Sequence, residues 1–190
     1  MNNKIPVGIS NRHIHLSSAH LASLFGEGYE LQELKPLSQP GQYAAQETVT
    51  IVGAKGEIGN VRILGPIRPK TQIEISKTDS FKLGVAPPVR DSGDTAGSPG
   101  LKVVGPKGEV ELEEGVIIAA RHIHFHPSDA KSFGVADGDK VSIRTQGERS
   151  VVFENVLCRV HEQYALDCHL DTDEGNAAGL KTGEFIELIK

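Results

Sequence analysis

A five-residue motif that occurs twice constrains this chain more than any other feature. Residues 12–16 read Arg-His-Ile-His-Leu, and residues 121–125 read Arg-His-Ile-His-Phe. Each copy is followed by a short stretch that ends in Phe-Gly. Two copies of one motif that begin 109 positions apart indicate two related halves of the chain. Residues 91–100 are rich in turn formers and lie between the copies, so we interpret them as a loop or linker that separates the halves.

Short apolar runs bounded by glycine predict a mainly β fold. Residues 49–64 are typical of a β-hairpin whose turn lies at residues 53–56, and residues 101–110 show the same pattern. Residues 141–144 and 184–189 alternate as strands do. Strands this short and evenly spaced favour a barrel or a sandwich.

Helix signals are sparse. Ser17-Ser18 provides an N-cap before residues 19–25, and Pro127-Ser128 provides one before residues 129–133. Glycine follows each stretch as a stop signal. Residues 171–179 are expected to form a loop near the end of the chain.

The two His-x-His pairs predict a metal site. Residues i and i+2 of a strand point to the same face, so His13 with His15, and His122 with His124, each present two imidazoles side by side. Zinc favours imidazole ligands, although cobalt or nickel would accept the same donors. The alternative is a repeated turn in which histidine caps a helix.

Further ligands are needed to complete such sites. Alternation in residues 164–170 places His169 on one face with Asp167, and leaves Cys168 as a buried small hydrophobe. Glu74 is the candidate for the other pair, with a solvent-facing strand residue as the alternative. Arg68 could hold a phosphate beside a metal because a guanidinium forks onto phosphate oxygens. A surface arginine in a proline-containing loop is the alternative reading.

Composition and missing motifs exclude several classes of protein. The net charge is -5 and no basic run is present, so nucleic acid is not expected as a partner. No apolar stretch is long enough to cross a membrane. Two cysteines and no signal peptide favour the reducing cytoplasm. Phosphate-loop, dinucleotide-binding and serine-nucleophile motifs are absent from the sequence.

Four segments together resemble the phosphate propanoyltransferase (PduL-type phosphotransacylase) family: residues 9–16, 65–74, 120–125 and 169–176. The resemblance covers essentially the whole chain. It implies two interleaved β-barrels capped by short helices, with the active site at the barrel interface. Residues 1–11 and 120–190 would form the first barrel, and residues 12–119 the second.

The resemblance also implies two zinc ions per chain and a set of site residues. His13, His15 and Glu74 would hold the first zinc, and His122, His124 and His169 the second. Arg68 would be the catalytic, phosphate-binding residue. Coenzyme A would contact Ile9, Ser10, Asn11, Lys55, Arg62 and Asn176.

The expected reaction is direct attack of phosphate on an acetyl- or propanoyl-CoA thioester, which gives acyl phosphate and free coenzyme A. A dinuclear zinc hydrolase acting on a thioester or phosphoester is the alternative, and a binding module with structural zinc is a third reading. A homodimer is the expected assembly. The chain starts just before Ile5, without the targeting extension of encapsulated family members. A cytoplasmic enzyme is therefore expected, with a propanediol-degradation enzyme inside a bacterial microcompartment as the alternative.

Overall fold

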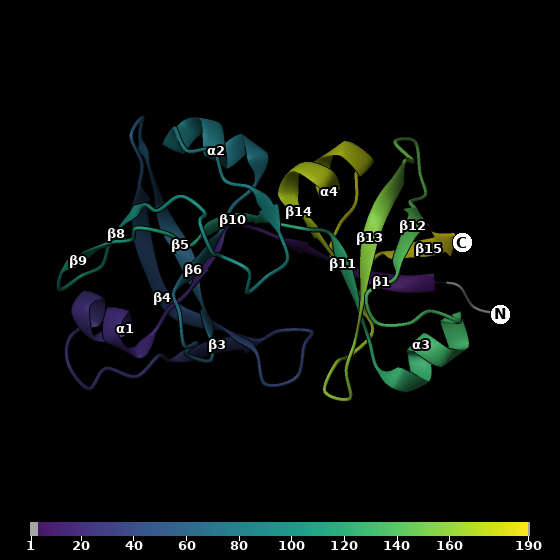
Figure 1. Ribbon diagram of the computed structural model, residues 1–190, viewed down its shortest axis with the longest axis horizontal. Helices are drawn as coiled ribbons and strands as arrows, with labels where there is room; N and C mark the ends of the chain where they lie inside the picture. Colours follow the sequence, from purple (N-terminus) through teal and green to yellow (C-terminus); the bar gives the residue numbers. More distant parts are fainter. Residues whose placement is uncertain (1–3, 190) are drawn as a thin grey trace. The chain divides into compact units, whose positions relative to one another are not determined.

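The computed structural model describes residues 4–189, which divide into two compact units (Figure 1). Unit 1 contains the N-terminal residues up to Asn11, the short piece Ser38–Pro40, and the chain from Ala120 onward. Unit 2 contains Arg12–Leu37 and Gly41–Ala119. The loop at residues 91–100 therefore lies inside unit 2 and does not separate the two halves, because the chain passes from one unit to the other between Ala119 and Ala120.

Unit 1 is a closed barrel. In barrel order its strands are β1 (Lys4–Ser10), β14 (Asp167–Asp171), β11 (His122–Phe125), β13 (Val152–Val160), β12 (Lys140–Arg144) and β15 (Phe185–Ile189). β1 runs parallel to β14, and β11 runs parallel to β13, while the other neighbours are antiparallel. The predicted strands at residues 141–144 and 184–189 are confirmed.

The barrel interior is built from every second residue of its strands, as a closed sheet requires. Ile123 on β11 lies opposite Cys158 on one side and Cys168 on the other, and all three are fully buried. Cys168 is therefore a small core residue, as alternation predicts. Because residues of one strand alternate between faces, burying Ile123 in the core turns His122 and His124 away from it.

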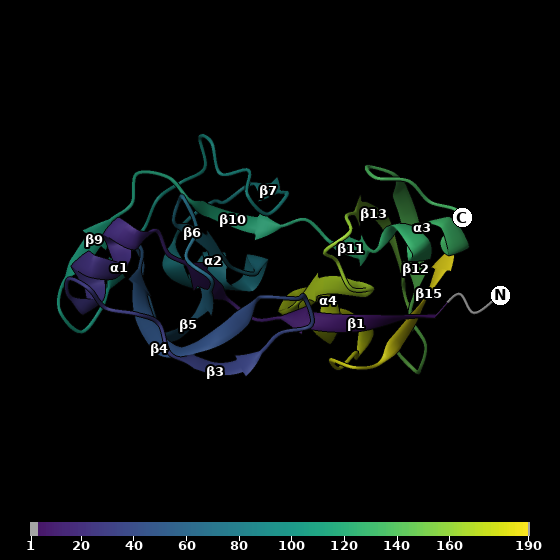
Figure 2. The same cartoon turned by 90° about the horizontal axis from the view of Figure 1, so that it is seen from below.

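Unit 2 is a larger sheet that curls as a half-barrel. Its strands follow the order β7 (Val89–Arg90), β10 (Val116–Ala119), β6 (Gln72–Glu74), β2 (His13–His15), β5 (Glu57–Gly65), β4 (Tyr43–Val52), β8 (Lys102–Val104) and β9 (Glu109–Glu111). β3 (Glu33–Pro36) lies along β4 outside this path (Figure 2). Both predicted hairpins are confirmed, as β4 with β5 and as β8 with β9. The mainly β architecture is confirmed too, although this sheet stays open whereas the sheet of unit 1 closes.

Two of the short helices follow the predicted signals. α1 (Ser18–Phe25) begins after Ser17, whose side chain accepts a hydrogen bond from the backbone of His20. α3 (Pro127–Phe133) begins after His126, so the N-cap is this imidazole and not Ser128. Pro127 occupies the first turn, where its missing N–H costs nothing.

The prediction of a loop at residues 171–179 is wrong, because α4 (Thr172–Ala178) forms there. Asp171 and Glu174 exchange side-chain to backbone hydrogen bonds of 2.9 and 3.0 Å, which is a capping box. α2 (Lys77–Leu83) begins in the same way, with Ser76 and Asp79. Reciprocal capping satisfies the first free N–H groups, so even a helix with glycine inside it can form. No helix in residues 4–189 is both long and apolar enough to cross a membrane.

Candidate functional site

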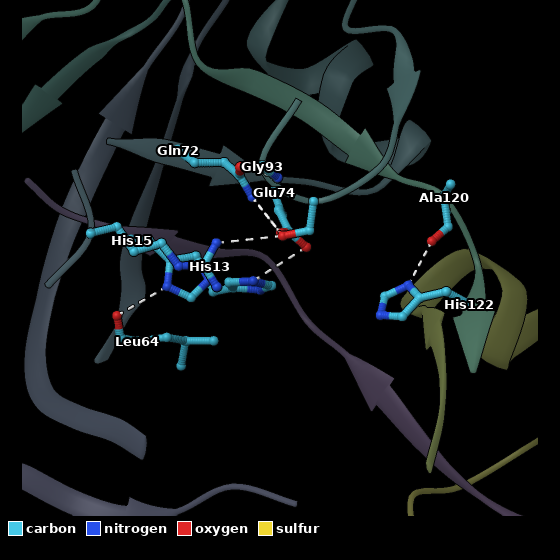
Figure 3. A network of polar contacts seen from close by, with 10 residues as sticks. His13, His15, Leu64, Gln72, Glu74, Gly93, Ala120 and His122 are labelled. Carbon is cyan, nitrogen blue, oxygen red and sulfur yellow. Dashed lines mark hydrogen bonds and ion pairs between the residues drawn. The ribbon is translucent and has the colours of Figure 1, made fainter. Parts of the chain in front are cut away.

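The first candidate site lies on β2 and β6 of unit 2. The two strands are antiparallel, and Glu74 lies directly opposite His13 in their register. One ligand atom each from His13, His15 and Glu74 lies within 4.8 Å of the others. Figure 3 shows both imidazoles beside the carboxylate of Glu74. This group, called the two-His/Glu group below, could hold a metal ion.

Neighbouring polar side chains fix the carboxylate of Glu74. The amide of Gln72 donates a hydrogen bond of 2.6 Å to Glu74 Oε1, and the hydroxyl of Ser92 donates one of 2.8 Å to the same atom. Gln72 is itself fixed, because its carbonyl oxygen accepts a hydrogen bond of 2.8 Å from the backbone of Gly93 (Figure 3). Sequence analysis missed these contacts, since Ser92 and Gly93 lie in the loop at residues 91–100.

The charge state of this group suits a cation. Burial, the neighbouring His13 and the charge of Arg68 lower the pKa of His15 to about 3, so its imidazole is neutral and keeps a lone pair. Burial opposes ionisation of Glu74, but the charge and hydrogen bond of His13 outweigh it and hold the Glu74 pKa below its usual range. A neutral imidazole, such as that of His15, and an ionised carboxylate, such as that of Glu74, are the states that bind metals.

The second candidate site lies on β11 and β14 of unit 1. His169 on β14 lies directly opposite His122 on β11. The three rings of His122, His124 and His169 have centroids 4.7 to 5.0 Å apart, and one nitrogen from each lies within 4.8 Å of the others. The Nδ1 atom of His122 lies 2.8 Å from the carbonyl oxygen of Ala120 (Figure 3). This three-His group could also hold a metal ion.

An unsatisfied atom favours a cation at the three-His group. Burial, the other two histidines and Arg159 lower the pKa of His124 to about 2, so the ring is neutral. Its Nδ1 atom is buried and has no hydrogen-bond partner among residues 4–189. A buried polar atom without a partner is costly. The donor set therefore fits a metal ion of the kind that imidazole binds.

The two groups are equivalent parts of an internal repeat that is larger than the His-x-His motif. In each unit, the residue opposite the first histidine supplies the third candidate ligand, and a capped helix follows that strand. The motif arginine contacts the capping carboxylate of this helix: Arg12 Nε lies 2.8 Å from Asp79, and Arg121 Nε lies 2.7 Å from Glu174. Each copy of the repeat therefore consists of a motif strand, the strand opposite it and the helix that follows, although these segments are far apart in the sequence.

Arg68 lies near the two-His/Glu group. Its backbone N–H donates to the carbonyl oxygen of Leu16, directly after β2, and its charge acts on the pKa of His15. Its guanidinium also donates a hydrogen bond of 3.5 Å to the Ser92 hydroxyl. Arg68 therefore brings a positive charge to the candidate metal ligands, as a phosphate-binding residue would need to.

The six residues expected near coenzyme A lie in different places. Ile9 and Ser10 end β1, and Ile9 packs against Gly175, the neighbour of Asn176 on α4. Asn11 follows β1. In unit 2, Lys55 is exposed in the turn between β4 and β5. Arg62 donates hydrogen bonds of 3.0 and 2.7 Å to the backbone carbonyls of Ala45 and Gln46, which gives it a structural role in unit 2.

Two further side chains border the three-His group and were not singled out from the sequence. The ring of Tyr164 lies 4.3 Å from that of His124, and the guanidinium of Arg159 lies 5.9 Å from the Tyr164 ring. Arg159 is opposite His124 in the parallel register of β11 and β13. Only this pairing brings Arg159 to the site, so no local sequence signal could have identified it.

Comparison with known proteins assigns the chain to a protein family. The sequence profile described as phosphate propanoyltransferase matches residues 6–181. A phosphate propanoyltransferase from Thermotoga maritima is 59% identical over 187 residues, which cover 98% of this chain and 89% of the relative. Another from Lachnoclostridium phytofermentans is 52% identical over 97% of this chain and 87% of the relative. Phosphate propanoyltransferases are acyltransferases, and this chain is an enzyme of that class. It belongs to the phosphate propanoyltransferase family, which confirms the resemblance found in its sequence.

Proposed function

We propose that this enzyme is a phosphotransacylase that interconverts acyl-CoA and phosphate with acyl phosphate and coenzyme A, with acetyl or propanoyl as the acyl group. Relatives that bear the name phosphate propanoyltransferase over nearly the whole chain support this reaction. The observation that carries the proposal for this chain is the position of Arg68, whose charge acts on His15 of the two-His/Glu group. An anion-binding group and a candidate metal site thus occur together.

In this proposal His13, His15 and Glu74 hold one zinc ion, and His122, His124 and His169 hold a second. Six protein ligands for two cations leave coordination positions open, as in catalytic rather than structural zinc sites. Bound zinc would supply positive charge that stabilises a developing oxyanion and a departing thiolate. The neutral imidazoles of His15 and His124, the ionised Glu74 and the unsatisfied Nδ1 of His124 all support this assignment.

The side chains then account for a direct displacement. Arg68 binds two oxygens of phosphate through its planar fork and orients a third oxygen for attack on the thioester carbonyl. A carbon–oxygen bond forms and the carbon–sulfur bond breaks, with its electron pair leaving on the sulfur of coenzyme A. The proton that phosphate brought ends on the thiol.

This displacement requires no covalent acyl-enzyme, and the cysteines support that view. Cys158 and Cys168 are fully buried in the barrel of unit 1. Burial and nearby carboxylates raise the pKa of Cys158 to about 11, and burial also raises the pKa of Cys168. The thiolate is the nucleophilic form, so neither residue is suited to carry the acyl group.

The remaining assignments belong to the same proposal. Residues 1–11 with 120–190, and residues 12–119, act as two domains, and two chains form a homodimer. Coenzyme A contacts Ile9, Ser10, Asn11, Lys55, Arg62 and Asn176. The packing of Ile9 against α4 supports a shared role for Ile9 and Asn176.

A dinuclear zinc hydrolase would use the same open coordination positions with water as the nucleophile. Family membership favours the transferase, and a single assay separates the two. Purified enzyme is incubated with acetyl-CoA or propanoyl-CoA, with and without phosphate, and both free thiol and acyl phosphate are measured. The transferase forms them in equal amounts and only when phosphate is present. Release of thiol without phosphate would establish the hydrolase instead.

A further inference from the structure

The two candidate metal groups differ in the position of a carboxylate on the strand that carries the third candidate ligand. On the strand that carries the third ligand, two side chains share one face: an inner residue opposite the first histidine of the motif, and an outer residue opposite the second. In unit 2 the inner residue is Glu74 and the outer residue is Gln72. In unit 1 the inner residue is His169 and the outer residue is Asp167. The carboxylate therefore occupies the inner position in unit 2 and the outer position in unit 1.

Both outer residues contact the inner one. Gln72 donates its amide N–H to Glu74 over 2.6 Å, and Asp167 Oδ2 lies 3.1 Å from His169 Nε2. Asp167 is 4% exposed, so its carboxylate has exchanged bulk water for this contact. Burial of a carboxylate is costly unless a donor compensates it, and the imidazole of His169 lies within hydrogen-bond distance of Asp167 Oδ2.

The neighbouring strand leaves room for this pair. β1 runs alongside β14, and Gly8 lies opposite His169 in their register. A Cβ atom at position 8 would come within 3.2 Å of Asp167 Oδ2 and 3.5 Å of His169 Cδ2. Glycine at this position therefore permits the carboxylate and the imidazole to lie where they do.

We propose that Asp167 is a positioning residue of the three-His group, which accepts the Nε2 proton of His169 and so fixes the tautomer that presents Nδ1 to a divalent cation. A carboxylate that is hydrogen-bonded to one nitrogen of an imidazole fixes the ring orientation and makes the other nitrogen a stronger metal ligand. Gln72 is the counterpart in unit 2, where it orients a carboxylate instead. This inference rests on the metal binding of the proposed function.

The exchange of positions gives the two sites different charge. A cation held by three neutral imidazoles keeps its full positive charge for an incoming anion, whereas Glu74 cancels part of that charge in the two-His/Glu group. Asp167 supports the three-His site through a hydrogen bond and supplies no ligand oxygen. The three-His group is thereby suited to accept an anionic ligand such as a thiolate.

The test measures zinc affinity at this group alone. His13→Ala with His15→Ala in the full chain removes two ligands of the other group, so one site remains. In this background, competition with a chromophoric chelator gives the zinc dissociation constant before and after Asp167→Asn, which keeps the side-chain shape and removes the charge. We expect roughly 10–100-fold weaker binding. Glu162→Gln, an exposed carboxylate on the connection between β13 and β14, is the matched control and leaves the constant unchanged.

The outcomes distinguish this inference from the proposed function. If the background variant itself binds no zinc, the metal assignment of the proposed function fails. If it binds zinc and Asp167→Asn binds equally well, the positioning role is overturned while the proposed function stands. Circular dichroism of the metal-free proteins checks folding. Should Asp167→Asn not fold, Asp167→Ala takes its place, because it removes the acceptor of the His169 contact altogether, and the same criterion applies.

Discussion

The Nε2 atom of His13 lies 3.4 Å from a carboxylate oxygen of Glu74, and the two residues face each other across neighbouring antiparallel strands. The same register brings His169 opposite His122 in unit 1. Each pairing places a third potential ligand beside a His-x-His pair that could not form a complete site alone.

Removal of metal is expected to lower stability as well as activity. A cation that binds only the folded state stabilises it by RT ln(1 + [L]/Kd), which is about 2.7 kcal/mol at a free concentration 100 times Kd. Dialysis against a chelator should lower the thermal midpoint and abolish acyl phosphate formation, and added zinc should restore both. A thermal midpoint that does not change on chelation would contradict metal binding at these groups.

Loss of the Arg68 guanidinium should impair the use of phosphate without loss of metal. Arg68→Ala is expected to reduce kcat/KM for phosphate by about 10²-fold or more, because an unpositioned nucleophile loses most of its advantage. Zinc content, measured by elemental analysis, stays at the wild-type value. Arg144→Ala, which removes an exposed arginine on β12, is the control. Near-normal phosphate kinetics in Arg68→Ala would refute the role.

His124→Ala should lose about one equivalent of zinc per chain together with most activity, because the three-His group then keeps only two ligands. Elemental analysis and the coupled assay measure the two effects. His161→Ala removes an exposed histidine from the same unit and should bind zinc normally. Full zinc content in His124→Ala would disprove the ligand assignment.

The capping carboxylates predict a matched pair of stability effects. Arg121→Ala removes the ion pair with Glu174. The side chain of Arg121 is 33% exposed and that of Glu174 is 17% exposed. Since both groups are partly solvated, we expect a loss of about 1 kcal/mol in the free energy of unfolding, measured with urea. Arg12→Ala should have a similar effect through Asp79, because Arg12 Nε lies 2.8 Å from that carboxylate. A clear effect of only one substitution would argue against equivalent halves.

Thiol reagents should leave the enzyme active. Cys158 and Cys168 are fully buried, and the pKa of Cys158 is raised to about 11 by burial and by Asp139 and Asp137, so almost no thiolate exists near neutral pH. Iodoacetamide at pH 7 is expected to modify neither cysteine in the folded protein, as mass spectrometry would show. Rapid inactivation accompanied by alkylation would instead indicate a catalytic thiol.

Part of this protein could be predicted from short stretches of sequence. The His-x-His pairs, both glycine-turn hairpins and the helices α1 and α3 follow from local rules, because backbone geometry relates residues a few positions apart. The same reading failed at residues 171–179, although Asp171 and Glu174 carry the spacing of a capping box. The glycine and turn-forming residues of that stretch are equally typical of a loop.

The sequence by itself thus determined which side chains occur in pairs, on which face of a strand they lie, and to which family the chain belongs. Glu74 and His169 were already candidate ligands from the sequence, but only the tertiary structure decided that they lie opposite His13 and His122. It alone also placed Asp167 and Gln72 next to them, and Arg159 opposite His124. Strand register is fixed by burial of residues such as Ile14 and Ile123 in two separate cores. Because that burial depends on segments distant in the chain, no local pattern specifies it.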